Sequence, residues 1–87
     1  MINFGEQPAK EILQRRELTI TGIARLFGTS QFHLSRVLNG HAIPTTYDRM
    51  RLTALLDRPE SELFTEDALS ARPRIHRNKD QGTEEIG

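Results

Sequence analysis

The sequence predicts an all-α domain, and three observations carry that prediction. Apolar residues recur at steps of three and four along most of the chain, as on one face of a helix. Residues suited to capping helix starts precede these runs. Glycines follow two of them, and a glycine ends a helix readily because it adopts the left-handed conformation without a steric penalty.

The first expected helix begins near Pro8, because proline fits the first turn of a helix. It runs to about Arg16 and turns Ala9, Ile12 and Leu13 inward.

Two short helices with a tight turn between them are expected in residues 19 to 40. Thr19 caps the first, whose apolar face is Ile20, Ile23, Ala24 and Phe27. Gly28 ends that helix, and Ser30 caps the second, which Gly40 ends behind Asn39. Helices this short with so tight a linker cross steeply, as in a helix-turn-helix, and the small Ala24 suits a close crossing.

The second of these helices has a polar outer face. Its inward residues are Leu34, Val37 and Leu38, so Phe32, Ser35, Arg36 and Asn39 point away, with Gln31 and His33 flanking them. Glutamine, arginine, asparagine and serine carry the donors and acceptors that read base edges in the DNA major groove. A helix fits that groove and contacts bases mostly through its N-terminal part.

A fourth helix is expected after Pro44, with Thr45 as its cap and Asp48 completing a capping box. Its apolar set is Met50, Leu52, Leu55 and Leu56. Pro59 then opens a last short helix, whose Leu63 and Phe64 close the core. Residues 65 to 71 leave room for one more short helix. Residues 72 to 87 are expected to be a flexible mixed-charge tail, because they have too few apolar groups to offset the entropy of ordering.

Residues 18 to 40 resemble the lambda-repressor/Cro-type helix-turn-helix family, whose usual wording is close to LTxxxLAxxxGVSxxxISxxxNG. The residues that match in step, without a gap, are Leu18, Thr19, Ile23, Ala24, Gly28, Thr29, Ser30, Leu34, Ser35, Asn39 and Gly40. Those that continue the match are Pro44, Thr45, Met50, Leu52, Leu56, Leu63 and Phe64, so it covers roughly residues 8 to 64.

The chain departs from the family wording at three positions. Ile20 stands where many members carry a glutamine that braces the recognition helix and touches a phosphate. Asp57 replaces a common glycine, and Arg49 replaces a usual leucine.

The resemblance implies a compact five-helix lambda-repressor-like domain over residues 1 to 64. It also implies a sequence-specific transcriptional regulator, most often a repressor in a phage or mobile-element switch, that binds a palindromic double-stranded DNA operator as a homodimer. Three alternatives remain for the dimer surface: the last helix, the N-terminal segment Ile2–Phe4 and the tail.

The candidate DNA-binding residues form two groups. Those expected to read bases are Gln31, Phe32, His33, Ser35 and Arg36. Those expected at phosphates are Thr19, Thr29, Ser30, Asn39, His41 and Thr45. Each has a structural alternative: a solvated helix face for the first group, and helix capping, a helix stop or plain loop exposure for the second. Phe32 either touches a thymine methyl or packs on a neighbouring loop.

The charges are balanced overall but unevenly distributed. Twelve lysines and arginines offset twelve aspartates and glutamates. The 28 residues from Ile20 to Tyr47 nevertheless contain no carboxylate. A stretch free of carboxylates is what a phosphate-facing surface requires. Electrostatic contacts to phosphates supply most of the non-specific affinity for DNA.

Composition argues against several other classes of protein. The chain has no cysteine, three scattered histidines and no glycine-rich phosphate loop. We therefore expect that the protein is not an enzyme and that it binds neither a cofactor nor a metal. No apolar run approaches a membrane span of roughly 20 residues, and the N-terminus lacks a signal-peptide pattern. A cytoplasmic location is therefore expected.

An interaction role is the alternative to a simple regulator. An antitoxin-type protein would bind DNA through the helix-turn-helix and a protein partner through its C-terminal tail. The tail also holds a basic tract that either lies along DNA or stays solvated, formed by Arg72, Arg74, Arg77 and Lys79.

Overall fold

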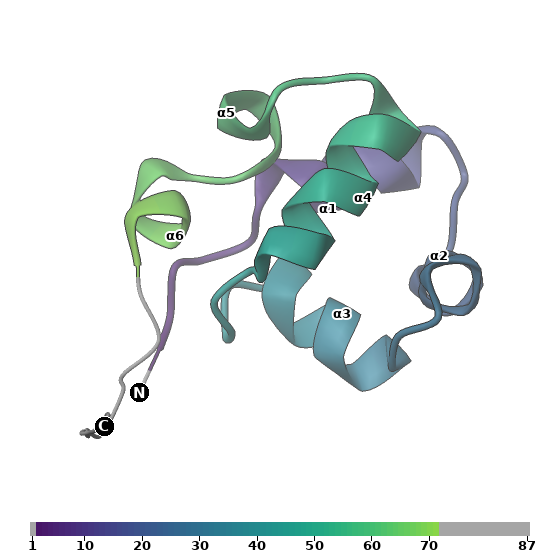
Figure 1. Cartoon of the computed structure of the whole chain (residues 1–87), viewed down its shortest axis with the longest axis horizontal. Helices are drawn as coiled ribbons and strands as arrows, with labels where there is room; N and C mark the ends of the chain where they lie inside the picture. Colours follow the sequence, from purple (N-terminus) through teal and green to yellow (C-terminus); the bar gives the residue numbers. More distant parts are fainter. Residues whose placement is uncertain (1, 72–87) are drawn as a thin grey trace, which may run out of the picture.

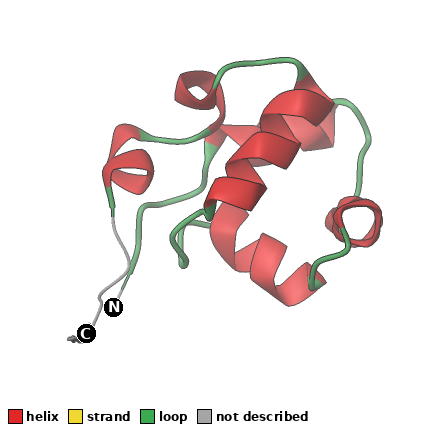
Figure 2. Cartoon of the chain, viewed as in Figure 1, coloured by secondary structure: helices red, strands yellow, loops and turns green. Residues whose placement is uncertain are grey.

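The all-α prediction is confirmed in the computed structural model, which describes residues 2–71. The six helices in this part of the chain are α1 (Pro8–Arg15), α2 (Ile20–Phe27), α3 (Gln31–Leu38), α4 (Thr46–Leu56), α5 (Glu60–Leu63) and α6 (Glu66–Ser70) (Figure 1). They alternate with short loops, and residues 2–71 contain no strand (Figure 2). The expected flexible tail, with its basic tract, lies outside the described residues.

The three predicted N-caps are confirmed. The hydroxyls of Thr19, Ser30 and Thr45 accept hydrogen bonds from backbone N–H groups in the first turns of α2, α3 and α4. At α4 the expected capping box is complete, because the Asp48 carboxylate accepts from the Thr45 N–H at 2.9 Å. These starts are therefore encoded locally, since each cap and its partner lie within three residues.

Both predicted glycine stops adopt the left-handed conformation. Gly28 has φ 72° and Gly40 has φ 84°. After Gly40 the chain folds back on α3, where the His41 N–H donates to the Arg36 carbonyl at 2.7 Å. This pattern satisfies carbonyls at the helix end that would otherwise lack partners.

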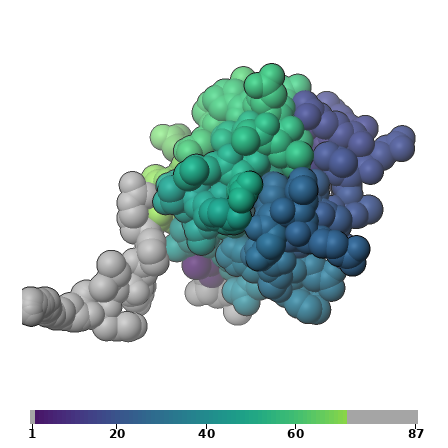
Figure 3. Space-filling model, turned by 45° about the vertical axis from the view of Figure 1, so that its right-hand side comes forward, coloured from purple at the N-terminus to yellow at the C-terminus, as the bar shows by residue number. Residues whose placement is uncertain are grey.

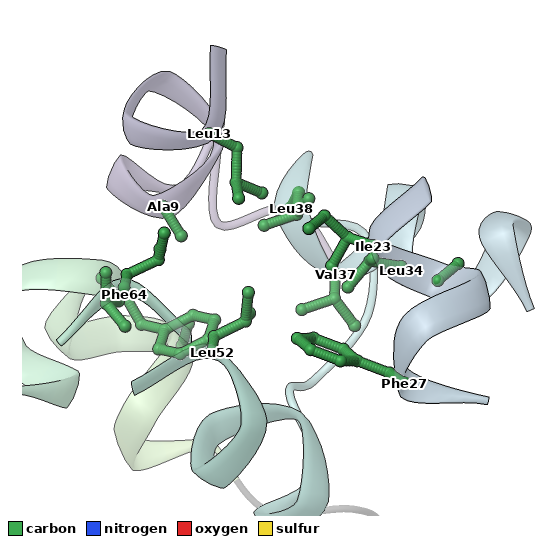
Figure 4. Close-up of a cluster of buried hydrophobic side chains, with 13 residues drawn as sticks. Ala9, Leu13, Ile23, Phe27, Leu34, Val37, Leu38, Leu52 and Phe64 are labelled. Atoms are coloured by element: carbon green, nitrogen blue, oxygen red, sulfur yellow. The ribbon is translucent and has the colours of Figure 1, made fainter. Parts of the chain in front are cut away.

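The core unites all six helices (Figure 4). Its buried members are Ala9, Leu13, Ile23, Ala24, Phe27, Leu34, Val37, Leu38, Leu52, Leu56, Leu63, Phe64 and Ala68. Ile12, Ile20 and Leu55 pack against this cluster while remaining partly exposed. The predicted inward stripes of α1, α2 and α3 are thereby confirmed.

Met50 belongs to the apolar set of α4 in the sequence, but in the structure it does not face the core. Its side chain is 62% exposed. The buried residues of α4 are Asp48, Leu52 and Leu56, which repeat every four residues. A residue two positions from Leu52 lies about 200° around the helix and therefore faces solvent.

The further short helix that residues 65 to 71 leave room for is present as α6, the sixth helix in residues 2–71, and it packs against the other five. Ala68 of α6 is 1% exposed and belongs to the same core. Gln7, a buried polar residue, also ties α6 to the N-terminal segment, because its Oε1 accepts from the Thr65 N–H at 2.9 Å. No helix within residues 2–71 is long and apolar enough to cross a membrane.

Asp57, which stands where glycine is common in the resembling family, adopts the left-handed conformation with φ 55°. This conformation is unfavourable for a residue with a Cβ atom. We expect Asp57→Gly to stabilise the domain by about 0.5–1 kcal/mol, after allowance for the greater entropy of glycine in the unfolded chain. Urea denaturation would show this as a higher midpoint at an unchanged m-value. Asp57→Ala serves as the control and should lower the midpoint; a lower midpoint for Asp57→Gly would contradict the prediction.

Candidate nucleic-acid interface

The helices α2 and α3 form the unit that the sequence singled out. Residues 28–30 link them, and Figure 1 shows α2 nearly end-on while α3 runs across the view. The two helices therefore cross steeply, as expected. Ala24 is buried on the inner side of α2, in agreement with the need for a small residue at a close crossing.

The outer face of α3 is exposed to solvent along the helix, from its first turn to its last. Gln31, Phe32 and Arg36 are exposed, and the Phe32 ring is 73% exposed. Phe32 therefore does not pack on a neighbouring loop. In Figure 3 the blue surface of residues around 20 to 40 is continuous at the lower right of the molecule.

The Gln31 side chain is hydrogen-bonded to a residue of α2. The Thr21 hydroxyl donates to Gln31 Oε1 at 2.6 Å, which joins the second residue of α2 to the first residue of α3. Ile20, at the position where the family carries its bracing glutamine, packs instead against the core. Thr21 was not among the predicted site residues, although it is the polar neighbour of the apolar Ile20 and the nearest alternative brace.

A chain of polar contacts joins α1 to the C-terminal part of this face. Lys10 Nζ lies 2.9 Å from a Glu6 carboxylate oxygen and donates to Asn39 Oδ1 at 2.6 Å. Asn39 Nδ2 in turn donates to Ser35 Oγ at 3.3 Å. Both polar ends of the Asn39 side chain are thus engaged within the protein. Lys10 was not predicted, because no local pattern relates it to residues 29 positions away.

His33 connects α3 to the start of α4. Its Nε2 lies 2.9 Å from Asp48 Oδ2, and the Asp48 side chain is almost fully buried. Because a carboxylate only accepts hydrogen bonds, Nε2 carries the proton in this pair. The imidazole remains about one-third exposed. This contact gives His33 a positioning role that the sequence analysis did not predict.

The remaining candidate phosphate residues lie at helix ends and in loops. Thr19, Ser30 and Thr45 are N-caps, as described above, so their hydroxyls already accept a backbone hydrogen bond. Thr29 is half-buried in the α2–α3 turn. His41 is exposed just after α3, and its carbonyl accepts from Arg36 Nη2 at 3.2 Å.

The charge distribution across this unit favours an anionic partner. Within α2 and α3 the charged side chains are Arg25 and Arg36, and both are exposed. Asp48, the first carboxylate after this stretch, is buried. The exposed surface of α2 and α3 therefore carries positive charge without an acidic residue of its own.

An apolar groove between α2 and α4 has a volume of about 260 Å³ and includes none of the residues predicted to read bases. Its lining residues are Leu26, Phe27, Arg51, Ala54 and Leu55. Leu26 is 66% exposed. This surface was not predicted, because Leu26 lies off the apolar face of α2 formed by Ile20, Ile23, Ala24 and Phe27.

Comparisons of the chain with models of known families, with curated proteins and with solved structures gave no match.

Proposed function

We propose that this chain is a sequence-specific DNA-binding transcriptional regulator with a lambda-repressor-like helix-turn-helix, and that α3 reads its operator. One observation carries the proposal. Gln31, Phe32 and Arg36 lie exposed on α3, Gln31 is hydrogen-bonded to Thr21 of α2, and neither helix carries a carboxylate.

The side chains on α3 suit the major groove. The guanidinium of Arg36 matches the two acceptors of a guanine edge, and glutamine offers both a donor and an acceptor. The exposed Phe32 ring supplies apolar contact for a thymine methyl group, which accounts for an aromatic residue on a polar face. Gln31 and Phe32 lie in the first turn of α3, so their contacts require the helix to enter the groove by its N-terminal part.

We further propose that the protein acts as a repressor in the cytoplasm and binds a palindromic operator as a homodimer, as the family resemblance implies. When a dimer binds two half-sites about one helical turn apart, its two recognition helices enter successive major grooves on the same face of the DNA. Selection of bound sites from random duplex DNA tests this directly, because a dimeric regulator enriches a palindrome.

Gln31→Ala and Arg36→Ala are each expected to weaken binding to the selected operator by about 1–3 kcal/mol, because each removes hydrogen bonds to base edges. Fluorescence anisotropy with labelled operator and with random duplex would measure the two affinities. Binding of Gln31→Ala to random DNA should change little, since a neutral side chain adds little to phosphate attraction.

Arg15→Ala is the matched control for Arg36→Ala. It removes one positive charge from an exposed side chain on α1, outside α2 and α3. Operator affinity should be nearly unchanged in this control. Equal losses on operator and random DNA for the α3 variants would show that α3 is not the reading helix.

The antitoxin-type alternative makes a different prediction. A partner protein co-expressed with the full chain would be captured, and removal of residues 72 to 87 would abolish that capture while DNA binding survived. Capture that survives removal of residues 72 to 87 would contradict this alternative.

A further inference from the structure

We propose that a pocket between α5 and α6 is the docking site for residues 72 to 77 of the chain's own tail. Ile75 enters the pocket, and the arginines on either side of it pair with Glu66 and Asp67. This inference goes beyond the proposed function, because the docking needs no DNA. It also gives the basic tract a role different from contact with DNA and from plain solvation.

The pocket has an apolar floor and a polar rim. Its volume is about 440 Å³, and its lining residues are Ser61, Phe64, Glu66, Leu69 and Ser70. Phe64 is 1% exposed and belongs to the core, whereas Ser61, Glu66 and Ser70 are exposed around it. An apolar hollow with such a rim suits one aliphatic side chain whose neighbours are polar or charged.

The surface beside the pocket is acidic. Residues 60 to 67 contain four carboxylates and no basic residue. Two of them, Glu60 and Glu62, each lie within ion-pair distance of an arginine. Glu66 and Asp67 are exposed, and neither has an ion-pair partner within residues 2–71. This surface therefore favours a cationic occupant.

The segment that follows α6 has the complementary chemistry. Residues 72 to 77 read RPRIHR, which places three arginines and a histidine around one branched apolar residue, Ile75. The segment contains no carboxylate. An apolar anchor flanked by positive charges matches an apolar pocket flanked by negative ones.

The segment can reach the pocket from its own chain. Ser70 lines the pocket, and Ile75 follows Ala71 by four residues, which span up to about 13 Å. The five residues of α6 rise only about 7.5 Å, so four residues suffice to fold back over the helix. A short tether also gives the segment an effective concentration of about millimolar, so a few contacts are enough to hold it.

Paramagnetic relaxation in the full chain tests the docking. The chain contains no cysteine, so Asn78→Cys provides a single position for a nitroxide label, which broadens the amide signals of nearby residues. Labelled ¹⁵N chains are diluted into unlabelled chains, so that only contacts within one chain contribute. We expect strong broadening at Ser61 and Phe64, which line the pocket from the α5 side.

Ile75→Ser separates docking from the effect of the tether. It leaves the length and charge of the tail unchanged and removes only the apolar anchor. Broadening at Ser61 and Phe64 should fall by about threefold or more, because the tether then supplies a local concentration without a bound state.

The carboxylates are tested by the double variant Glu66→Gln, Asp67→Asn. It should also reduce the broadening, but by less than Ile75→Ser, because exposed ion pairs contribute little individually. Glu11→Gln is the matched control, since it removes an exposed carboxylate from α1, and it should leave the broadening unchanged. Unchanged broadening in the double variant would contradict the part assigned to Glu66 and Asp67.

Three results would overturn the inference. Equal broadening with and without Ile75 would show that the tether alone brings the label near α5. Broadening strongest at α2 or α3 would place the tail elsewhere. Broadening that disappears on dilution would show that the pocket takes the tail of a second copy. No sample contains DNA, so each of these results leaves the proposed function untouched.

Discussion

Replacing Gly40 with alanine is expected to destabilise the folded domain by about 3 kcal/mol or more, among the largest effects of a single substitution. Two causes act together. Gly40 has φ 84°, which is unfavourable for a residue with a Cβ atom. An added Cβ would also lie 2.6 Å from the backbone nitrogen of Gly5, and backbone atoms cannot rotate out of the way as a side chain does.

The N-terminal segment would have to move to relieve that clash. It is anchored beside Gly40, because the Phe4 N–H donates to the Gly40 carbonyl at 2.8 Å and the Gln7 N–H donates to the Leu38 carbonyl at 2.8 Å. Movement would weaken both hydrogen bonds at the C-terminal end of α3. Chemical denaturation of the variant and the unmodified chain would measure the loss.

Gly28→Ala is the matched control for Gly40→Ala. Gly28 has a similar φ of 72°, but a Cβ there would meet no atom within 4 Å. The control therefore reports the conformational penalty alone, about 1–2 kcal/mol. Equal losses in the two variants would show that the close approach of Gly5 to Gly40 does not exist in solution.

Asp48→Ala is expected to destabilise the domain by about 2–4 kcal/mol. Asp48 is 2% exposed, and its Oδ2 accepts from the Thr45 N–H and from His33 Nε2, both at 2.9 Å. Alanine removes the capping box and leaves both donors without this acceptor. Asp48→Asn keeps the shape and an acceptor oxygen, so its loss should be smaller.

A double-mutant cycle with His33→Ala tests the contact between α3 and α4 directly. If the hydrogen bond forms, the two single losses should exceed the loss in the double variant, because the second change has no bond left to break. Losses that simply add would show that His33 and Asp48 do not interact. In that case Asp48 would act only as part of the cap of α4.

Helix starts and stops could be predicted from the sequence because their interactions are local. Thr45 and Asp48 lie three residues apart, so each can bond to the backbone of the other whatever the rest of the chain does. Gly28 and Gly40 end their helices through their own backbone freedom. The inward stripes of α1, α2 and α3 were equally readable, because a single apolar face leaves only one way to bury the helix.

The side of α4 that faces the core could not be predicted in this way. Its apolar residues do not define one narrow stripe, and Asp48 rather than Met50 occupies the buried side. The contact with His33 and the Thr45 cap stabilise Asp48 there. A buried carboxylate is acceptable only when such partners exist, and one of these partners comes from another helix.

The sequence by itself determined the helices, the caps of α2, α3 and α4, and the exposed polar face of α3. The tertiary structure alone decided which side chains meet across that face: Thr21 with Gln31, Lys10 with Asn39, and Gln7 with Thr65. The partners in these pairs are 10, 29 and 58 residues apart. Their contacts depend on how the helices pack, and no spacing rule within a single helix relates one partner to the other.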